Sequence, residues 1–267
     1  VTGVQTCALP ISYATLVNTP SGFDSLIYRG GEHPPSLMFQ RRVASGGWSN
    51  ALPIFCQNIK PGYTYYGGHI AAAPDGTLYV GGHFYARERG HSLGVVVLKS
   101  TNLGATWQTL RGEPVSVPVE YSPAIAVPHA EPSHNPYLSG LEVDRRGVLW
   151  ALTSTNGIQS RQLLLSRWTV TGWQTVDVAR FLPAERVPCG ASAACFVIDT
   201  VGRIHLVVQA ALAAEVAGIN FHHVWGHPSN TIFHLVSDDE GKTFACREIS
   251  QGFLPNISKT EIGRAHV

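Results

Sequence analysis

Several side chains suited to acid–base chemistry lie close together in the first third of the sequence. His69 follows a Gly-Gly pair, and His83, Tyr85 and Arg87 follow a second Gly-Gly pair. An imidazole titrates near neutral pH, so a histidine can take a proton from a substrate at physiological pH. A guanidinium can bind a carboxylate through two parallel hydrogen bonds. We therefore predict four catalytic candidates: His69 or His83 as general base, Tyr85 assisting it, and Arg87 on a carboxylate.

A second set of basic and aromatic residues is spread over other polar stretches of the chain. Aromatic rings can stack on sugar faces, and arginine and histidine can neutralise carboxylates. Such a set suits a neutral or anionic sugar, although surface loops also collect polar residues without any function. The substrate-binding candidates are Arg29, His134, Tyr137, His222, His223 and Trp225.

Metal binding by the histidines is a further option. His69, His83, His222 and His223 provide imidazole nitrogens, but no tight ligand spacing supports a metal site among them. We therefore predict neither a metal nor a cofactor at the site.

A repeated pattern of strands and turns positions these residues. Two alternating apolar stretches joined by a glycine turn are followed by a variable loop, a third strand and a turn ending in an aromatic residue. Complete copies are expected over 69–110, 141–178 and 195–249, and an earlier copy over 25–55 shows three strands only. The turn aromatics are Trp48, Trp107, Trp173 and Phe244.

Each copy predicts a sheet of four antiparallel strands joined by short turns. Such a sheet cannot cover both of its faces alone, and radial stacking of several sheets solves this in a β-propeller. A linear solenoid is the alternative, although its repeats are usually shorter and more regular. We expect an all-β propeller with about four blades visible, as an open arc or a strained ring.

The direction of the strands decides which loops share an end of the propeller. The first–second and third–fourth turns of every blade are short and lie at one end. The second–third loops and the connections into each first strand lie at the other end, and most of the histidines fall there. Because function concentrates on variable loops above a rigid scaffold, we expect the site at that second end.

Two of the third–fourth turns carry a recognisable motif. Ser237 to Phe244 reads SDDEGKTF, and Ser100 to Trp107 reads STNLGATW with Asn102 in the place of Asp239. An aspartate or asparagine at this point can accept hydrogen bonds from turn amides, and the glycine permits a positive φ. This pattern resembles the Asp box of the sialidase, or BNR-repeat, families. The resemblance implies that the box is a folding element on the face away from the active site, so Asp239 is not expected to be catalytic.

The resemblance also implies activity on carbohydrates. The segment GGHIAAAPDGTLYVGGHF, followed by VVVLKS, resembles the BNR-4 type of repeat, and some propeller polysaccharide lyases share this neighbourhood of families. A sialidase-like hydrolase or a uronate lyase is therefore expected, and a non-catalytic glycan-binding or cell-surface propeller is the alternative. A sialidase needs an arginine triad, yet the usual Arg-Ile-Pro motif is absent and Arg29 in IYRGG is only a loose substitute.

Composition limits the kinds of partner that the protein is expected to bind and the compartment in which it is expected. Charged residues make up 14% of the chain and the formal net charge is +1, which argues against a nucleic-acid-binding surface. The sequence contains no run of 18 or more apolar residues, so it predicts no membrane-spanning helix. Four cysteines, Cys56, Cys189, Cys195 and Cys246, permit disulfides or four free thiols, and a Cys189–Cys195 bridge is one option. We expect a secreted or cell-surface protein with a glycan as its partner.

The two ends of the chain have an unusual relationship. Residues 1–11 and 261–267 can be back-translated into DNA strings that are reverse complements over roughly twenty bases, and both resemble read-through of a sequencing adapter. We therefore expect residues 1–11 and 261–267 to be non-native tails that flank a partial propeller over residues 12–260.

Overall fold

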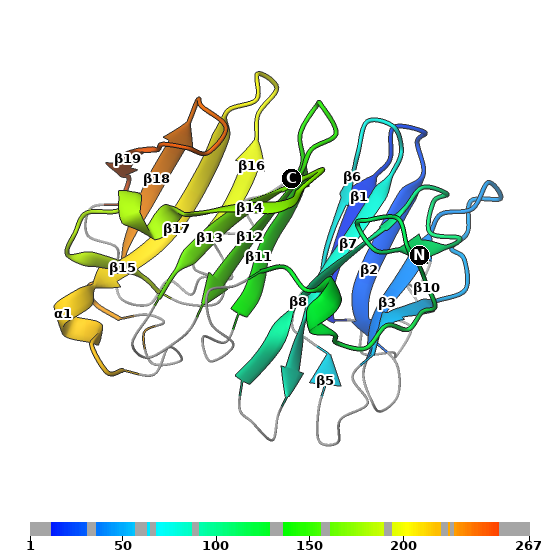
Figure 1. The fold of residues 1–267 in the computed structure, drawn as a ribbon, viewed down its shortest axis with the longest axis horizontal. Helices are drawn as coiled ribbons and strands as arrows, with labels where there is room; N and C mark the ends of the chain where they lie inside the picture. Colours follow the sequence, from blue (N-terminus) through cyan, green and yellow to red (C-terminus); the bar gives the residue numbers. More distant parts are fainter. Residues whose placement is uncertain are drawn as a thin grey trace, which may run out of the picture.

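The structure is a computed structural model, and it describes residues 12–30, 36–56, 63–64, 68–86, 91–128, 136–155, 161–189, 194–219, 224 and 227–250. Nearly all of its regular structure is antiparallel β-strand, arranged in four sheets that follow one another along the chain. Figure 1 shows these sheets side by side, with the first and the fourth at the two ends of the row. The predicted non-native tails lie outside the described residues.

The first and second sheets come from the first half of the chain. The first sheet holds β1 (Ser12–Asn18), β2 (Asp24–Gly30), β3 (Ser36–Arg41) and β4 (Leu52–Phe55). The second sheet holds β5 (Tyr63–Thr64), β6 (His69–Ala72), β7 (Leu78–Ala86), β8 (His91–Ser100), β9 (Trp107–Gln108) and β10 (Pro114–Val115).

The third and fourth sheets repeat this order. The third sheet holds β11 (Pro136–Val143), β12 (Leu149–Thr155), β13 (Leu163–Thr169) and β14 (Gly172–Asp177). The fourth sheet holds β15 (Arg186–Pro188), β16 (Ala194–Ile198), β17 (Ile204–Leu212), β18 (Thr231–Ser237) and β19 (Ala245–Glu248). The described helices are the short α1 (Ala213–Val216), η2 (Pro123–Ile125) and η4 (Val178–Phe181).

Neighbouring sheets pack through their first strands, as the blades of a propeller do. β6 contacts β1 on one side and β11 on the other, and β11 in turn contacts β16. The all-β propeller architecture predicted from the repeat is therefore confirmed. The blades form an open row in which the first and fourth sheets are farthest apart (Figure 1), which is the open arc rather than the strained ring.

Two details of the blades differ from the repeat pattern. The first copy was expected to have three strands, but β1 pairs with β2 through Leu16 opposite Leu26 and supplies the fourth. The repeat pattern also gave no sign that the first strand is divided in two of the blades. In the second sheet, β5 and β6 instead pair with successive parts of β7, and β15 and β16 do the same along β17.

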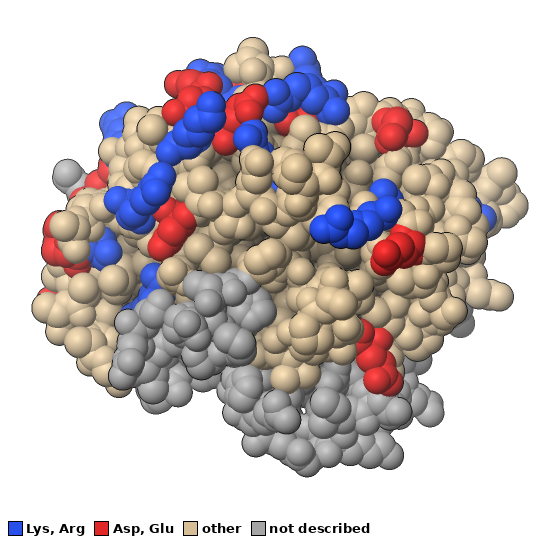
Figure 2. Space-filling model, viewed as in Figure 1, with Lys and Arg blue, Asp and Glu red and all other residues tan. Residues whose placement is uncertain are grey.

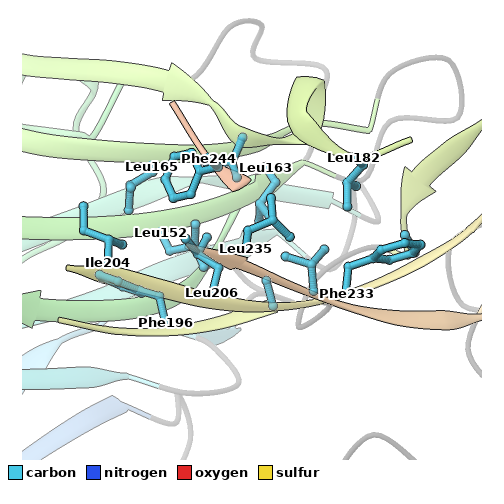
Figure 3. Close-up of a cluster of buried hydrophobic side chains, with 14 of the residues drawn as sticks. Leu152, Leu163, Leu165, Leu182, Phe196, Ile204, Leu206, Phe233, Leu235 and Phe244 are labelled. Atoms are coloured by element: carbon cyan, nitrogen blue, oxygen red, sulfur yellow. The ribbon is translucent and has the colours of Figure 1, made fainter. Parts of the chain in front are cut away.

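The hydrophobic cores lie between successive sheets because alternate residues of each strand point to opposite faces. Leu152, Leu163 and Leu165 of the third sheet meet Leu206 and Leu235 of the fourth sheet in one such core, shown in Figure 3. Comparable clusters join the first sheet to the second and the second to the third. Burial of each large aliphatic side chain contributes about 1.5–3 kcal/mol, so these layers hold the blades in register.

The two motif turns share a hydrogen bond from the threonine amide, whereas the threonine hydroxyl donates to Asp239 and accepts from Nδ2 of Asn102. Asp239 accepts hydrogen bonds from the Thr243 amide at 2.9 Å and the Thr243 hydroxyl at 2.6 Å, and Asn102 accepts one from the Thr106 amide at 2.9 Å. The hydrogen bonds from Thr243 lower the pKa of Asp239 to about 2. Asp239 is thus a turn-forming residue, as expected from the sequence.

Glu240 in the second of these turns connects two sheets. It has a φ of 60°, in the left-handed region, and it accepts hydrogen bonds at 2.6 Å from both Arg146 and Arg167 of the third sheet. Figure 2 shows basic and acidic side chains interleaved at this end of the molecule rather than gathered into one broad patch of a single sign.

The described residues contain no helix long and apolar enough to cross a membrane. Cys56 and Cys246 are free thiols, and the Cys189 thiol donates to the side-chain oxygen of Asn230 at 3.0 Å. Cys189 is buried and Cys195 is exposed.

Candidate functional site

Three of the predicted site residues come together between the second and third blades. His69 opens β6, His83 lies near the end of β7, and Tyr137 lies near the start of β11. Because β6 and β7 are antiparallel and His69 faces Gly81 across the ladder, both histidines lie at the same end of the second sheet. This end is opposite to the Ser237–Phe244 turn, as the strand directions predicted.

The ring of His83 packs edge-on against the ring of Tyr137. The ring centroids are 4.3 Å apart and the planes cross at 75°. Both side chains are buried, with 1% of His83 and 8% of Tyr137 exposed. The third blade therefore brings a phenol into direct contact with a histidine of the second blade.

A glycine makes this contact possible. A Cβ atom on Gly81 would lie 2.6 Å from Cδ2 of Leu138, a separation that Cβ atoms essentially never show, so the Leu138 side chain would have to move. The bare backbone of Gly81 thus lets β11 pack closely against β7, and Tyr137, the residue before Leu138, reaches His83. The second Gly-Gly pair noted in the sequence has a packing role at the site.

Burial keeps both imidazoles neutral. It lowers the pKa of His83 well below the ordinary value of 6.5, and the nearby His69 lowers it further. Burial also lowers the pKa of His69 to about 4, although a hydrogen bond with the Leu138 backbone partly opposes this shift. Since a ring nitrogen that donates to a carbonyl carries the proton, the other nitrogen of His69 holds the free lone pair. At neutral pH the pair consists of two unprotonated bases next to a phenol.

Of the other predicted residues, Arg29 is described and does not join this group. Arg29 lies on β2 of the first sheet, opposite Leu37, rather than between the second and third blades. The backbone of Tyr85 pairs with Tyr63 and Ser92 at the end of β7, and its side chain lies outside the described residues. Also outside the described residues are Arg87, His134, His222, His223 and Trp225.

Two charged residues of the third blade, away from the His83–Tyr137 contact, also have shifted pKa values and were not singled out in the sequence. Arg161 precedes β13, and its Nη2 donates to the backbone carbonyls of Val216 at 3.3 Å and Ile219 at 2.9 Å. Its Nη1 is buried and makes no hydrogen bond among the described residues, and burial lowers the pKa of the guanidinium. In the sequence, Arg161 directly follows the variable loop of the third blade, and this position could have marked it as a candidate.

Glu142 is the second missed residue. It lies on β11 opposite Trp150, and burial raises the pKa of its carboxyl from 4.5 to about 7. In the sequence it looked like an ordinary polar position of the alternating stretch LEVD, because alternation alone does not reveal how deeply the next blade covers it.

Comparison with known proteins supports the fold. No family model and no curated protein matches the sequence. Among solved structures, the chain is similar to a polysaccharide lyase of family PL25, an ulvan lyase bound to -[GlcA(1-4)Rha3S]-, with a TM-score of 0.65 and 12% identity over 90% of this chain and 56% of that chain. The chain thus spans about half the length of that lyase.

Two glycosidase-type structures show the same fold. The α-L-arabinanase of Penicillium chrysogenum, complexed with arabinobiose, has a TM-score of 0.57 and 14% identity over 91% of this chain and 68% of its own. The leech intramolecular trans-sialidase has a TM-score of 0.55 and 9% identity over 90% of this chain and 50% of its own. At these identities the similarity establishes the β-propeller fold.

Proposed function

We propose that this chain is part of a carbohydrate-active propeller of the sialidase-like, BNR-repeat type, and that it cleaves a uronate-containing polysaccharide by β-elimination. The observation that carries the proposal is the contact between His83 and Tyr137, with the neutral His69 beside them at the loop end of the blades. The ulvan lyase among the similar structures binds a polymer of this chemical class.

In such an elimination the base takes the proton from C5, next to the carboxylate of the uronate. The electron pair forms a C4=C5 double bond, the C4–O4 bond breaks, and the leaving oxygen takes up a proton. His69 is the proposed base, because its side chain is partly exposed and its proton is directed to the Leu138 backbone. Tyr137 is the proposed proton donor to the leaving oxygen, and His83 holds its ring in place.

Hydrolysis is the weaker alternative. Glycosidases usually place two carboxyl groups on opposite sides of the bond, roughly 5–10 Å apart. The groups brought together here are instead imidazoles and a phenol. A sialidase would further require several arginines around the sugar carboxylate, and Arg29 lies in another part of the propeller.

The experiment is an assay of the purified chain on uronate polysaccharides, including a GlcA–Rha3S polymer, and on sialosides. Lyase activity produces unsaturated uronate ends that absorb in the ultraviolet, whereas hydrolysis produces reducing ends without that absorbance. Tyr137→Phe and His69→Gln should abolish the unsaturated product, and His234→Gln in the fourth sheet should retain it. Binding of oligosaccharide without any product would favour the non-catalytic glycan-binding alternative, and the absence of both products refutes the enzyme proposal.

A secreted or cell-surface location follows from the proposal, since uronate polysaccharides are extracellular polymers. Detection of the native protein in the culture medium or on the cell surface tests that location.

A further inference from the structure

A pair of histidines on the fourth sheet forms a second cluster of titratable groups, away from the candidate site. His205 lies on β17 and His234 on β18, and their rings are nearly parallel, at 8°, with centroids 5.4 Å apart. The buried residues of β17, such as Leu206 and Val208, point toward the third sheet, so His205 points to the opposite face. A quarter of its side chain (25%) is exposed.

The hydrogen bonds around this pair define where its protons are. Nε2 of His205 lies 3.2 Å from Oδ2 of Asp199, and Nδ1 of His205 lies 3.2 Å from Nε2 of His234. An ionised carboxylate can only accept, so Nε2 of a neutral His205 carries the proton and Nδ1 carries a lone pair. Nε2 of His234 then donates to that lone pair.

Asp199 is itself held firmly. Its Oδ1 accepts hydrogen bonds from the amides of Val201 and Arg203, both at 2.9 Å, and its Oδ2 accepts one from Nε of Arg203 at 2.8 Å. Partial desolvation opposes ionisation, but the hydrogen bonds from Arg203 and its neighbours lower the pKa of Asp199 well below its usual range. The carboxylate that orients His205 is therefore fixed and charged.

One distance in this arrangement, which is also that of a hydrogen bond, suits a divalent transition metal. Zinc binds imidazole nitrogens at about 2.0–2.1 Å in tetrahedral sites, which places two such nitrogens about 3.3 Å from each other. The 3.2 Å spacing between the two histidines already has this value. Metal-bound histidines usually donate their other N–H to a carboxylate, as His205 does to Asp199.

We propose that His205 and His234 chelate a divalent transition-metal ion such as Zn²⁺ across β17 and β18, with Asp199 orienting His205 and water completing the shell. The described residues hold no cluster of three or more potential ligands, so the proposed site relies on these two imidazoles alone. Arg203 and Arg247 face the same region and repel a cation, so direct coordination rather than general attraction must hold it. His234 shifts its own proton to Nδ1 when Nε2 binds the metal.

The bound ion would cross-link β17 and β18 and stabilise the fold, and this role does not depend on the proposed function. The cross-strand ladder pairs His205 with Val236 and Val207 with His234, which sets the two rings diagonally across the hairpin. An ion bound to both rings holds this register against unfolding, because it binds the folded state alone.

The test is isothermal titration of the whole chain with ZnCl₂ near pH 7.5 in the presence of a non-thiol reductant. We expect one bound ion, a higher Tm with zinc, and at least tenfold weaker binding in His205→Gln and in His234→Gln. Asp199→Asn should weaken binding about 10- to 100-fold, as the loss of an orienting partner does. His227→Gln and Cys195→Ser, which remove other zinc ligands, are the matched controls and should bind as the wild type does.

Two results overturn the proposal: binding to either histidine variant within twofold of wild type, or loss of binding in Cys195→Ser. Because each variant could perturb folding, its Tm without zinc is compared with that of the wild type. Cu²⁺ electron paramagnetic resonance on the unmodified chain gives a second readout. Hyperfine coupling to two imidazole nitrogens supports the site, and coupling to none or to one refutes it.

Discussion

Acid should destabilise this protein through His69. The pKa of its imidazole is about 4 in the folded state, against 6.5 when the side chain is solvated. Because the unfolded chain takes up this proton first, the stability that His69 contributes is present above pH 6.5 and is lost as the pH falls toward 4. The full difference is about 3 kcal/mol, at about 1.4 kcal/mol per pKa unit, and about 2 kcal/mol of it is lost by pH 5. The figure is an upper value, since part of the imidazole is exposed.

The assay is denaturant unfolding near pH 7.5 and near pH 5 for the wild type and for His69→Gln. Glutamine has no titrating group and can still donate to the Leu138 backbone. The wild type should lose about 2 kcal/mol more free energy of unfolding than the variant between the two pH values. His227→Gln lies outside the site and should retain the wild-type difference. An equal loss in the wild type and in His69→Gln refutes the assignment of a buried neutral imidazole.

Further predictions concern three residues: Tyr137 and Gly81 at the candidate site, and Glu240 between the third and fourth sheets. Tyr137→Phe should keep its Tm within a few degrees of wild type while the elimination rate falls about 10²–10⁴-fold, the usual contribution of a proton-transferring group, as measured by product absorbance. Gly81→Ala should reduce the free energy of unfolding by about 1–3 kcal/mol in urea, because the added methyl overlaps Leu138; an unchanged midpoint contradicts the close approach of β11. Glu240→Gln should cost about 1 kcal/mol by removing two partly exposed ion pairs. Glu240→Gly should cost less than Glu240→Gln, since glycine relieves the left-handed backbone, and a greater loss contradicts this reasoning.

Much of the fold could be predicted from local patterns. The alternation in TLYVGGHF, VLWALT and RIHLVV corresponds to β7, β12 and β17, and the glycine turns lie between the strands as expected. The strand β1 was missed because SYATLVN alternates weakly and is recognisable only from its pairing with β2. The divided first strands were missed for a similar reason, since two short segments become one edge only when β7 or β17 is present to pair with both.

The site illustrates a different limit. Residue types and strand directions were enough to place His69 and His83 at the loop end of one blade. The partner of His83 came from another blade, and Tyr137 had been predicted as a sugar-binding residue rather than a neighbour of the histidines. Contacts between blades depend on how closely two sheets approach, which Gly81 and Leu138 determine together. A single-sequence pattern carries no information on such a pair.

The sequence by itself determined the propeller class, the register of its blades and the end of the second blade at which His69 and His83 lie. Those properties are local, because side-chain alternation and turn chemistry act between residues that are near one another along the chain. The tertiary structure alone decided which titratable groups meet and what their pKa values are. Burial of His69 and His83 arises from packing of the third blade on the second, and desolvation by that packing turns two ordinary histidines into neutral bases at pH 7.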